Sequence, residues 1–288
     1  MAKKPLFGKK LISLLVLFFG AFIISTLIYF QKSPDGKLHL IFCDVGQGDA
    51  ILVRTPTGAQ ILIDGGPDNS VLSCLGKAMP FFDRTLELVV LTHPQADHFT
   101  GLVSVLENYQ VEKVLRTQAV NSTEEFKEFL EAELTEKAAK FEAKSNLTIN
   151  LDEKLSGKII WPPKSILGPT SDLNDLSIVL RLNYGNFCAM FTGDATNDVW
   201  YELAAQGSLS SCFLLKVAHH GSKNATNPEF LEIVKPKIAL VSAGKNNRYG
   251  HPHGEVLEEL TKRQIRVLAT AEIGTIEIIT DGKSVQIK

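Results

Sequence analysis

The sequence has no excess of charge of either sign. Its 30 Lys and Arg residues balance 32 Asp and Glu residues, which leaves a formal net charge of -2. This balance excludes a chain that is drawn to nucleic acid or to an acidic membrane by its overall field. No internal repeat and no low-complexity segment is present. Any anionic substrate must therefore be held by a few local groups.

Cysteine is scarce and scattered. The chain has 4 cysteines, and no two of them form a CxxC pair, which excludes a zinc site of that pattern. Cys43 and Cys188 lie within apolar, strand-like runs. This placement predicts that the cysteines are small buried hydrophobic residues. A disulfide between two of Cys43, Cys74, Cys188 and Cys212 stays open as the alternative.

Long apolar runs are missing except at the N-terminus. Lysines within residues 1–10 precede an uncharged apolar stretch over residues 11–30, which is long enough to cross a membrane as a helix. No small-x-small cleavage signature follows at residues 29–34, which favours an uncleaved signal anchor over a signal peptide. A buried core helix is the alternative.

The lysines also predict an orientation. Four precede the apolar stretch, whereas only Lys32 and Lys37 closely follow it, so the positive-inside rule places the basic tail, residues 1–10, in the cytoplasm. Residues 31–36 form a short polar linker, and residues 37–288 form one domain. The sequence thus predicts a single-pass protein of the cytoplasmic membrane with its domain outside the cytoplasm.

The main chemical signal follows an apolar run at residues 88–91. The next residues, 92–98, read Thr-His-Pro-Gln-Ala-Asp-His. Such a run predicts a buried strand, and ligands placed just past its end project into the cleft at the edge of the sheet. His93, Asp97 and His98 are therefore candidates for a metal site. The alternative is a loop residue at His93 and a solvated helix that begins at His98.

Two further predicted strands end in the same kinds of side chain. The strand at 187–192 precedes Asp194, and the strand at 213–218 precedes His219 and His220. Six of the 7 histidines lie in three short loops after strands, and their joint occurrence predicts a metal site. Imidazole and carboxylate suit Zn²⁺ or Mn²⁺, with one or two ions per chain. A bridged pair of ions can lower the pKa of a shared water to make hydroxide.

Two more aspartates, Asp44 and Asp64, follow apolar strands near the start of the domain. Each is either a turn-capping residue or a supporting group of the metal site. Glycines after Asp64 allow the backbone to approach closely there.

Seven short motifs, in order along the chain, resemble the metallo-β-lactamase superfamily and, more closely, the hydrolase domain of ComEC-type DNA-uptake proteins. They are Asp-Val-Gly-Gln-Gly-Asp (44–49), Leu-Ile-Asp-Gly-Gly (62–66), Thr-His-Pro-Gln-Ala-Asp-His (92–98), Leu-Asn-Asp-Leu-Ser (173–177), Thr-Gly-Asp (192–194), His-His-Gly-Ser (219–222) and Arg-Tyr-Gly-His-Pro-His (248–253). The resemblance implies an α+β fold, a four-layer αββα sandwich with metals at one edge. It also places the predicted transmembrane helix in the inner membrane of a bacterium.

The resemblance further implies a set of metal ligands, namely His93, Gln95, Asp97, His98, Asp194 and one or both of His219 and His220. Asp194 would bridge two ions, and Asp64 would support the ligands from behind. Of the paired histidines, His219 is favoured as the ligand with His220 behind it. Asp97 is also expected to take part directly in catalysis.

The sequence departs from the pattern at Gln95, where the superfamily has His and ComEC-type proteins commonly have Asp. A neutral amide oxygen is a weaker ligand than either, so we expect the second site, with Asp97 and His98, to bind metal more tightly than the first. The separate middle histidine of the superfamily is also missing, and Asn174, Asp175 or Ser177 stands in its place.

The resemblance places further residues around the metals or the substrate. They are Asp44, Asn174, Ser177, Ser222, Tyr249 and His251. His253 or His251 is expected to contact a substrate phosphate or to act as a general acid, with His253 favoured as the catalytic residue. A solvated loop is the alternative for residues 248–253. Lys223 and Lys245 add local positive charge.

The leading functional hypothesis is an anchored metal-dependent hydrolase that cleaves a phosphodiester, with single-stranded DNA as the substrate and a DNA-uptake channel as a partner. A phosphodiesterase acting on a small or cell-envelope ester is a second hypothesis. A binding module in which Gln95 has weakened catalysis is the third, and it belongs to a non-enzyme class. The sequence offers no sign of the oligomeric state.

Overall fold

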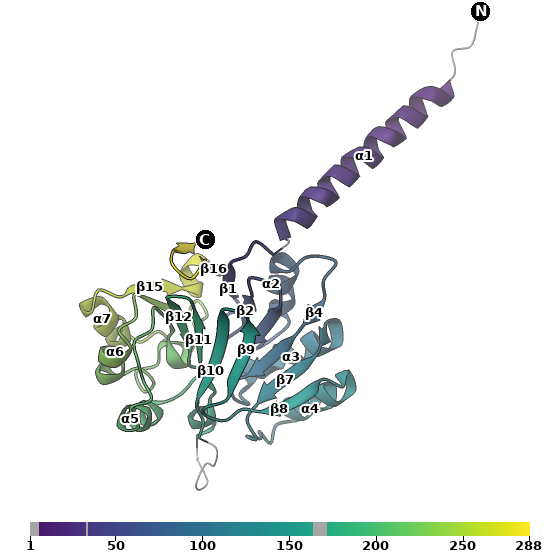
Figure 1. Cartoon of the computed structure of the whole chain (residues 1–288). Helices are drawn as coiled ribbons and strands as arrows, with labels where there is room; N and C mark the ends of the chain where they lie inside the picture. Colours follow the sequence, from purple (N-terminus) through teal and green to yellow (C-terminus); the bar gives the residue numbers. More distant parts are fainter. Residues whose placement is uncertain (1–5, 33, 164–171) are drawn as a thin grey trace, which may run out of the picture.

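The domain consists of two β-sheets packed face to face with helices on both outer faces (Figure 1). The computed structural model describes residues 6–32, 34–163 and 172–288. The first sheet has eight strands in the order β17-β16-β1-β2-β3-β5-β7-β8, and the second has seven in the order β15-β14-β13-β12-β11-β10-β9. The predicted α+β class and its four layers are confirmed.

The strands of the first sheet are β1 (Leu38–Phe42), β2 (Ile51–Arg54), β3 (Gln60–Ile63), β5 (Leu88–Leu91), β7 (Lys113–Arg116), β8 (Ala139–Glu142), β16 (Ile276–Thr280) and β17 (Val285–Ile287). Those of the second sheet are β9 (Thr148–Asp152), β10 (Leu155–Trp161), β11 (Val179–Tyr184), β12 (Phe187–Phe191), β13 (Leu214–Lys216), β14 (Ile238–Val241) and β15 (Arg266–Ala269). A two-stranded ladder pairs β4 (Thr85–Leu86) with β6 (Gln110–Val111).

The helices divide between the two outer faces. Those on the first sheet are α2 (Ser70–Ala78), α3 (Ala96–Asn108) and α4 (Glu124–Glu136), and those on the second are α5 (Asn197–Ala205), α6 (Pro228–Val234) and α7 (Gly254–Lys262). Short helical turns are η1 (Leu173–Leu176), η2 (Ala218–Gly221) and α8 (Thr270–Ile273).

Strand alternation explains why both faces of each sheet are apolar. In β3, Ile61 and Ile63 join the core between the sheets, whereas Leu62 packs against the helices of the first sheet. In β11, Leu180 faces the other sheet and Val179 faces the helices. Each such burial stabilises the fold by about 1.5–3 kcal/mol relative to an exposed side chain. The sheets are thus held together at a fixed spacing, which is what lets loops from both meet at one edge.

Parallel pairing sets where the functional loops lie. Strands β3, β5 and β7 are parallel neighbours in the first sheet, and β12, β13 and β14 are parallel neighbours in the second. The carboxyl ends of parallel strands lie at the same edge of a sheet. The loops that follow β3, β5, β12 and β13 therefore gather at one rim of the sandwich.

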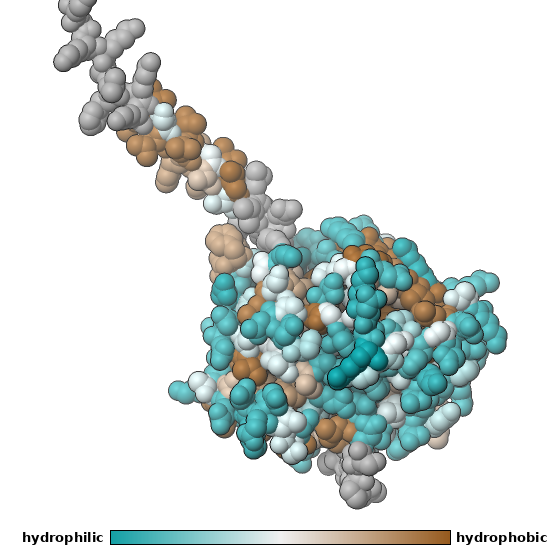
Figure 2. Space-filling view, turned by 180° about the vertical axis from the view of Figure 1, so that it is seen from behind, coloured by the Kyte–Doolittle hydropathy of each residue, from teal (hydrophilic) through white to brown (hydrophobic). Residues whose placement is uncertain are grey.

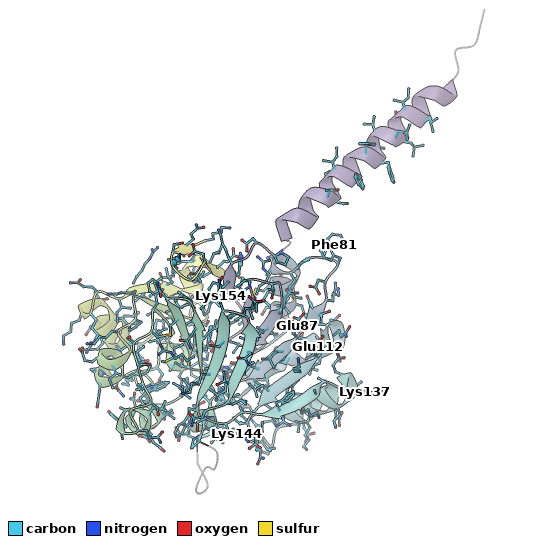
Figure 3. All side chains as sticks on the ribbon, viewed as in Figure 1. Phe81, Glu87, Glu112, Lys137, Lys144 and Lys154 are labelled. Atoms are coloured by element: carbon cyan, nitrogen blue, oxygen red, sulfur yellow. A yellow bond between two sulfur atoms is a disulfide. The ribbon has the colours of Figure 1, made fainter. Side chains whose placement is uncertain are left out.

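A long helix, α1 (Leu6–Lys32), precedes the domain and projects away from it (Figures 1 and 3). Its described apolar side chains between Leu11 and Ile24 are 51–71% exposed, and Figure 2 shows them as a brown stretch beyond the domain. The helix extends to Lys32, past the predicted start of the linker at residue 31. Residues 1–5 of the predicted basic tail lie outside the described residues.

No helix in the part of the chain that the structure describes is both long enough and apolar enough to span a membrane.

All four cysteines are buried, as predicted, and they form two disulfides, so the alternative of a disulfide holds for both pairs. Cys43, at the end of β1, bonds to Cys74 in α2, and Cys188 in β12 bonds to Cys212 before β13. The Cα atoms are 5.8 Å and 5.1 Å apart, within the usual range for a disulfide. Each bond ties a strand to a neighbouring element of its own half of the domain.

Candidate metal centre

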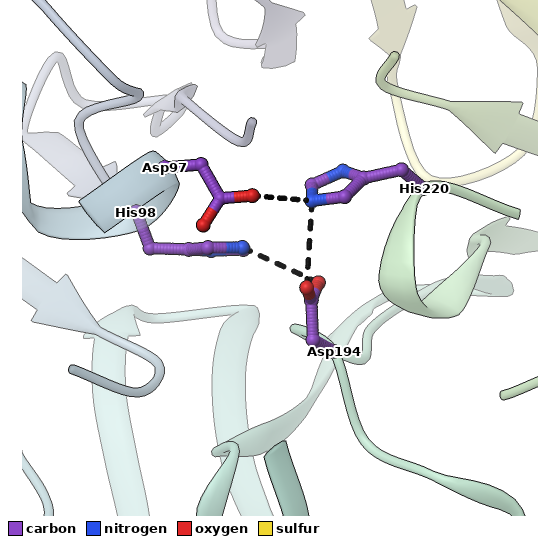
Figure 4. Close-up of side chains that lie close together, drawn as sticks. All are labelled: Asp97, His98, Asp194 and His220. Atoms are coloured by element: carbon purple, nitrogen blue, oxygen red, sulfur yellow. Dashed lines mark hydrogen bonds and ion pairs between the residues drawn. The ribbon is translucent and has the colours of Figure 1, made fainter. Parts of the chain in front are cut away.

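Side chains from both sheets meet at the rim (Figure 4). Asp97 and His98 lie in the first turn of α3, directly after β5, while Asp194 follows β12 and His220 lies in η2 after β13. His219 and His220 both have left-handed backbones, with φ of 49° and 55°, a conformation uncommon outside glycine. This sharp reversal brings both imidazoles to the rim.

Four of these groups form a compact cluster. One ligand atom each from Asp97, His98, Asp194 and His220 lies within 4.8 Å of the others. His220 Nε2 is 3.2 Å from Asp97 Oδ2 and 3.4 Å from Asp194 Oδ2, and His98 Nε2 is 3.3 Å from Asp194 Oδ1. Two imidazoles and two carboxylates thus face one small space, which is the donor set that Zn²⁺ and Mn²⁺ accept.

Asp64 and Thr92 fix the imidazoles on the first-sheet side. His98 Nδ1 donates to Asp64 Oδ2 at 2.8 Å, and the Thr92 hydroxyl donates to the same oxygen at 2.7 Å. The Thr92 hydroxyl has only one proton, and it donates that proton to Asp64. Its oxygen therefore accepts the hydrogen bond from Nδ1 of His93, which lies 3.2 Å away. Both rings therefore carry a proton on Nδ1 and turn Nε2 toward Asp194, and Asp64 has the supporting place expected for it.

A backbone carbonyl plays the same part on the second-sheet side. Nδ1 of His220 donates to the carbonyl oxygen of Ser242 at 2.8 Å, which leaves Nε2 directed at Asp97 and Asp194. The backbone N–H of Asp194 donates to Ser177 Oγ at 3.1 Å. Ser177 thus holds the carboxylate that lies at the middle of the cluster.

The cluster has the electrostatics of a cation site. Burial raises the pKa of the Asp194 carboxyl, but the imidazoles of His220 and His98 outweigh it and hold that pKa well below its usual range. Burial lowers the pKa of His98 and of His220, but Asp194 outweighs it and raises both well above 6.5. An ion that binds here therefore competes with protons for these rings.

Unpartnered buried atoms indicate that the residues fit a metal ion. Both carboxylate oxygens of Asp194 and the Nε2 atoms of His93 and His98 are buried and make no regular hydrogen bond, and their nearest polar neighbours are other members of the same group of side chains, at 3.3–4.0 Å. Buried polar atoms are normally paired, because an unpaired one is destabilising by about 1–3 kcal/mol. The Asp194 oxygens and Nε2 of His98 face the space shared with Asp97 and His220, so a divalent cation there would coordinate them.

His219 and His220 exchange the places expected for them. His220 is a member of the cluster and is 1% exposed, whereas His219 Nε2 is 3.8 Å from Asp194 Oδ2 with its side chain 28% exposed. The expectation that His219 is the ligand with His220 behind it is therefore reversed by the geometry. The two histidines are adjacent in the sequence, so the sequence pattern does not show which one faces the cluster; the backbone turn decides it.

The predicted first metal position is less complete. His93 is fully buried, its Nε2 is 4.0 Å from Asp194 Oδ2, and burial and the neighbouring His98 lower its pKa to about 3, so its ring is neutral. Gln95 is half-buried and precedes the first residue of α3 without capping the helix. No His, Cys, Asp or Glu cluster built on His93 occurs within the described residues.

The loop before α7 brings three aromatic rings beside the cluster. His251 lies 5.5 Å from His219 and 4.8 Å from His253, ring centre to ring centre, and the Tyr249 ring stacks on it at 5.6 Å. Burial and the positive charge of His219 and His220 lower the pKa of His251 to about 4. The His251 ring is therefore neutral at pH 7.

Three other residues that were predicted to lie near the metals or the substrate make contacts outside the cluster. Asp44 is exposed, takes a hydrogen bond from Gly46 and lines a separate cavity, so the structure does not bring it to the cluster. Ser222 is buried and closes the η2 turn through its N–H to His219. Asn174 is buried in η1 with its side-chain oxygen unpaired.

Two buried residues of the site escaped prediction. Lys216 is fully buried and forms an ion pair with Asp49, donates to the Gly193 carbonyl at 3.0 Å and lies 3.7 Å from Asp194 Oδ1. Asp49 also lies 3.5 Å from His220 Nδ1. A lone lysine within the apolar run 213–218 is the signal that could have found this pair, because buried lysines are almost always paired.

Comparisons with known proteins match most of the domain. A sequence model of the metallo-beta-lactamase superfamily matches residues 43–245. "ComE operon protein 3" of Bacillus subtilis is 32% identical over 267 residues, 87% of this chain and 34% of that protein. "Recombination protein 2" of Haemophilus influenzae is 27% identical over 284 residues, 96% and 33% of the two chains. "Competence protein ComA" of Neisseria gonorrhoeae is 26% identical over 253 residues, 86% and 33%.

The chain thus spans about one third of the length of these relatives. Among solved structures, the metallo-beta-lactamase fold protein YhfI of Bacillus subtilis superposes with a TM-score of 0.57 at 12% identity, covering 85% of this chain and 100% of that one. At this identity the likeness concerns the fold alone.

Proposed function

Because the chain belongs to the metallo-beta-lactamase superfamily and carries its metal-dependent hydrolase core, we propose that it cleaves phosphodiesters, with single-stranded DNA as the substrate. The observation that carries the proposal is the convergence of Asp97, His98, Asp194 and His220 on one small space with unpartnered buried atoms. The names of three relatives, among them a competence protein, favour a part in DNA uptake.

The residues of the rim have separate roles in metal binding and in orienting the ligands. A bound Zn²⁺ or Mn²⁺ supplies an activated water and stabilises the charge that develops on the phosphate. Asp97, His98, Asp194 and His220 hold the ion, and Asp64 keeps His98 turned toward it. Since all four side chains are carried by helical turns or tight loops that directly follow buried strands, the ion site is ordered before the substrate arrives.

His253 is the proposed donor to the leaving oxygen. Its Nδ1 accepts a hydrogen bond from the Lys223 N–H at 3.2 Å, so Nε2 carries a proton. That N–H can donate a hydrogen bond to the oxygen that leaves the phosphate.

We also propose that the site built on Asp97 and His98 binds metal more tightly than the position built on His93 and Gln95. The first has four ionisable ligands at mutual distances below 4.8 Å, whereas the second relies on a neutral amide. Metal titration by calorimetry tests this, with one tight and one weak ion expected. Two equally tight ions would refute it.

The proposed setting is the outer side of the cytoplasmic membrane of a bacterium, with α1 as the single anchor and a DNA-uptake channel as partner. The exposed apolar side chains of α1 support an apolar environment for that helix. Both disulfides support a location outside the reducing cytoplasm. Membrane fractionation with accessibility labelling of the domain in intact cells tests the setting.

The test of activity is degradation of end-labelled single-stranded DNA by the full chain with Mn²⁺ or Zn²⁺, and with chelator. Asp194→Asn, which keeps the size of a buried ligand, should abolish cleavage, whereas Glu107→Gln, which removes an exposed carboxylate, should not. Cleavage that persists in chelator or in Asp194→Asn would contradict the proposal. Hydrolysis of bis(p-nitrophenyl) phosphate without DNA cleavage would favour the small-ester hypothesis, and metal binding without either activity would favour a binding module.

A further inference from the structure

The carboxylates at this rim repel the phosphates of a nucleic-acid strand. Asp97 and Asp194 belong to the cluster, Asp49 and Asp64 lie beside it, and the ammonium of Lys216 forms an ion pair with Asp49. A metal ion attracts the phosphate that is cleaved, but each neighbouring phosphate of a strand brings another negative charge. A cation outside the cluster and close to it would offset that repulsion.

One cavity borders the cluster at the required place. It has a volume of about 450 Å³ and is lined by Gln47, Pro67, Ala96, Asp97, Asn247, Arg248 and Tyr249. Asp97 belongs both to this cavity and to the metal cluster, so the cavity borders the cluster at that residue. Its size falls in the range of pockets that hold small ligands of one nucleotide's bulk.

Arg248 is the cation that the cavity presents. Its guanidinium lies 4.8 Å over the Tyr249 ring and donates to the Tyr249 hydroxyl at 2.6 Å. Arg248 is exposed, and the Asp97 carboxylate attracts it without lying within ion-pair distance in the part of the chain that the structure describes. A guanidinium has five N–H donors in a planar fork, so most of them stay available for a phosphate.

The surrounding loop holds Arg248 in position. The side-chain oxygen of Asn247 accepts from the backbone N–H of Tyr249 at 3.1 Å and of His251 at 3.0 Å. The amide of Asn247 donates to the Gly244 carbonyl at 2.9 Å, and Tyr249 stacks on His251. Arg248 therefore rests on an ordered turn, which reduces the entropy lost when it binds an anion.

We propose that Arg248 binds the phosphate next to the one that is cleaved, that the cavity takes the nucleotide between them, and that Tyr249 is a positioning residue for the guanidinium. The inference rests on the proposed phosphodiester chemistry and adds that the substrate is a strand with more than one phosphate. Arg248 would then distinguish a polynucleotide from a small diester.

The experiment compares two substrates of the full chain, an end-labelled single-stranded oligonucleotide and bis(p-nitrophenyl) phosphate, which has no neighbouring phosphate. Arg248→Gln should raise KM for the oligonucleotide about tenfold or more and leave the small diester within twofold. Arg248→Lys should fall between, and Tyr249→Phe should raise KM less than Arg248→Gln. Lys154→Gln, which removes an exposed charge on the β9–β10 turn (Figure 3), should change neither.

Salt dependence gives a second readout that a merely structural role would not move. One lost phosphate contact on a single strand should reduce the slope of log affinity against log salt by about 0.7. Fluorescence anisotropy of the oligonucleotide on Asp194→Asn, with and without Arg248→Gln, measures this without cleavage. Equal losses on both substrates, or an unchanged slope, would overturn the inference. Failure of the unaltered chain to cleave either substrate would instead overturn the proposed function.

Discussion

Replacing Lys216 by methionine should destabilise the domain strongly, although the lysine is no metal ligand. Lys216 is fully buried, pairs with the buried Asp49 carboxylate and donates to the Gly193 carbonyl at 3.0 Å. Methionine fills nearly the same volume but has no charge and no donor. The Asp49 carboxylate would stay in the interior without its counter-ion.

Removing one partner of a buried ion pair is destabilising by about 3–5 kcal/mol. For domains of roughly this size, 1 kcal/mol moves Tm by about 2–4 °C. The expected drop for Lys216→Met is therefore about 6–20 °C. The double change of Lys216→Met with Asp49→Asn should recover more than half of the loss, because it leaves no unpaired charge.

Thermal unfolding followed by circular dichroism, with chelator present and the disulfides intact, measures these shifts. Lys154→Met is the matched control, since Lys154 is exposed and its loss should change stability by less than about 0.5 kcal/mol. A Tm drop for Lys216→Met no larger than that of the control would refute the reasoning. So would a double variant that is less stable than Lys216→Met alone.

Three further outcomes are expected. His220→Ala should weaken metal binding at least tenfold and His219→Ala less than threefold, measured by calorimetry; the opposite order would restore His219 as the ligand. Because Asp194 raises the pKa of His98 and His220 well above 6.5, protons compete with the ion, so the metal Kd should rise as pH is lowered from about 8 to about 6. A pH-independent Kd would contradict this. Serine at both Cys188 and Cys212, which are 24 residues apart, should lower the free energy of unfolding by about 3 kcal/mol in urea titrations, and an unchanged midpoint would contradict it.

The architecture and the clustering of polar side chains at the rim could be predicted from the sequence, because both depend on local patterns. Apolar strands that end in His93, Asp97, Asp194 or His220 are visible as short runs followed by polar residues. Parallel strands bring such ends to one edge whatever the order of the strands. The prediction of one metal site from three separate loops therefore needed no knowledge of which strands pair.

Choices between neighbouring residues could not be predicted in the same way. Asp44 and Asp49 belong to one motif, but only Asp49 is buried against Lys216, because the loop between them reverses before β2. His219 and His220 differ through two consecutive left-handed residues, a conformation that no propensity indicates. Sequence pattern specifies the period of a segment, whereas these choices depend on backbone angles within a turn.

The pairing of the cysteines also could not be predicted from the sequence. Four cysteines allow three connectivities, and none of these is favoured by spacing. Cys188 lies in β12 and Cys43 directly follows β1, so both look like apolar strand residues in the sequence, and their partners come from separate elements. Only the packing of α2 on β1, and of the segment before β13 on β12, brings the sulfur atoms together.

The origin of the four clustered groups has a consequence for how the protein is made. Asp97 and His98 follow a strand of the eight-stranded sheet, and Asp194 and His220 follow strands of the seven-stranded sheet. Neither half of the chain holds more than two of them, so a nascent or truncated chain would capture no ion firmly. A complete ion site would form only when both halves have come together.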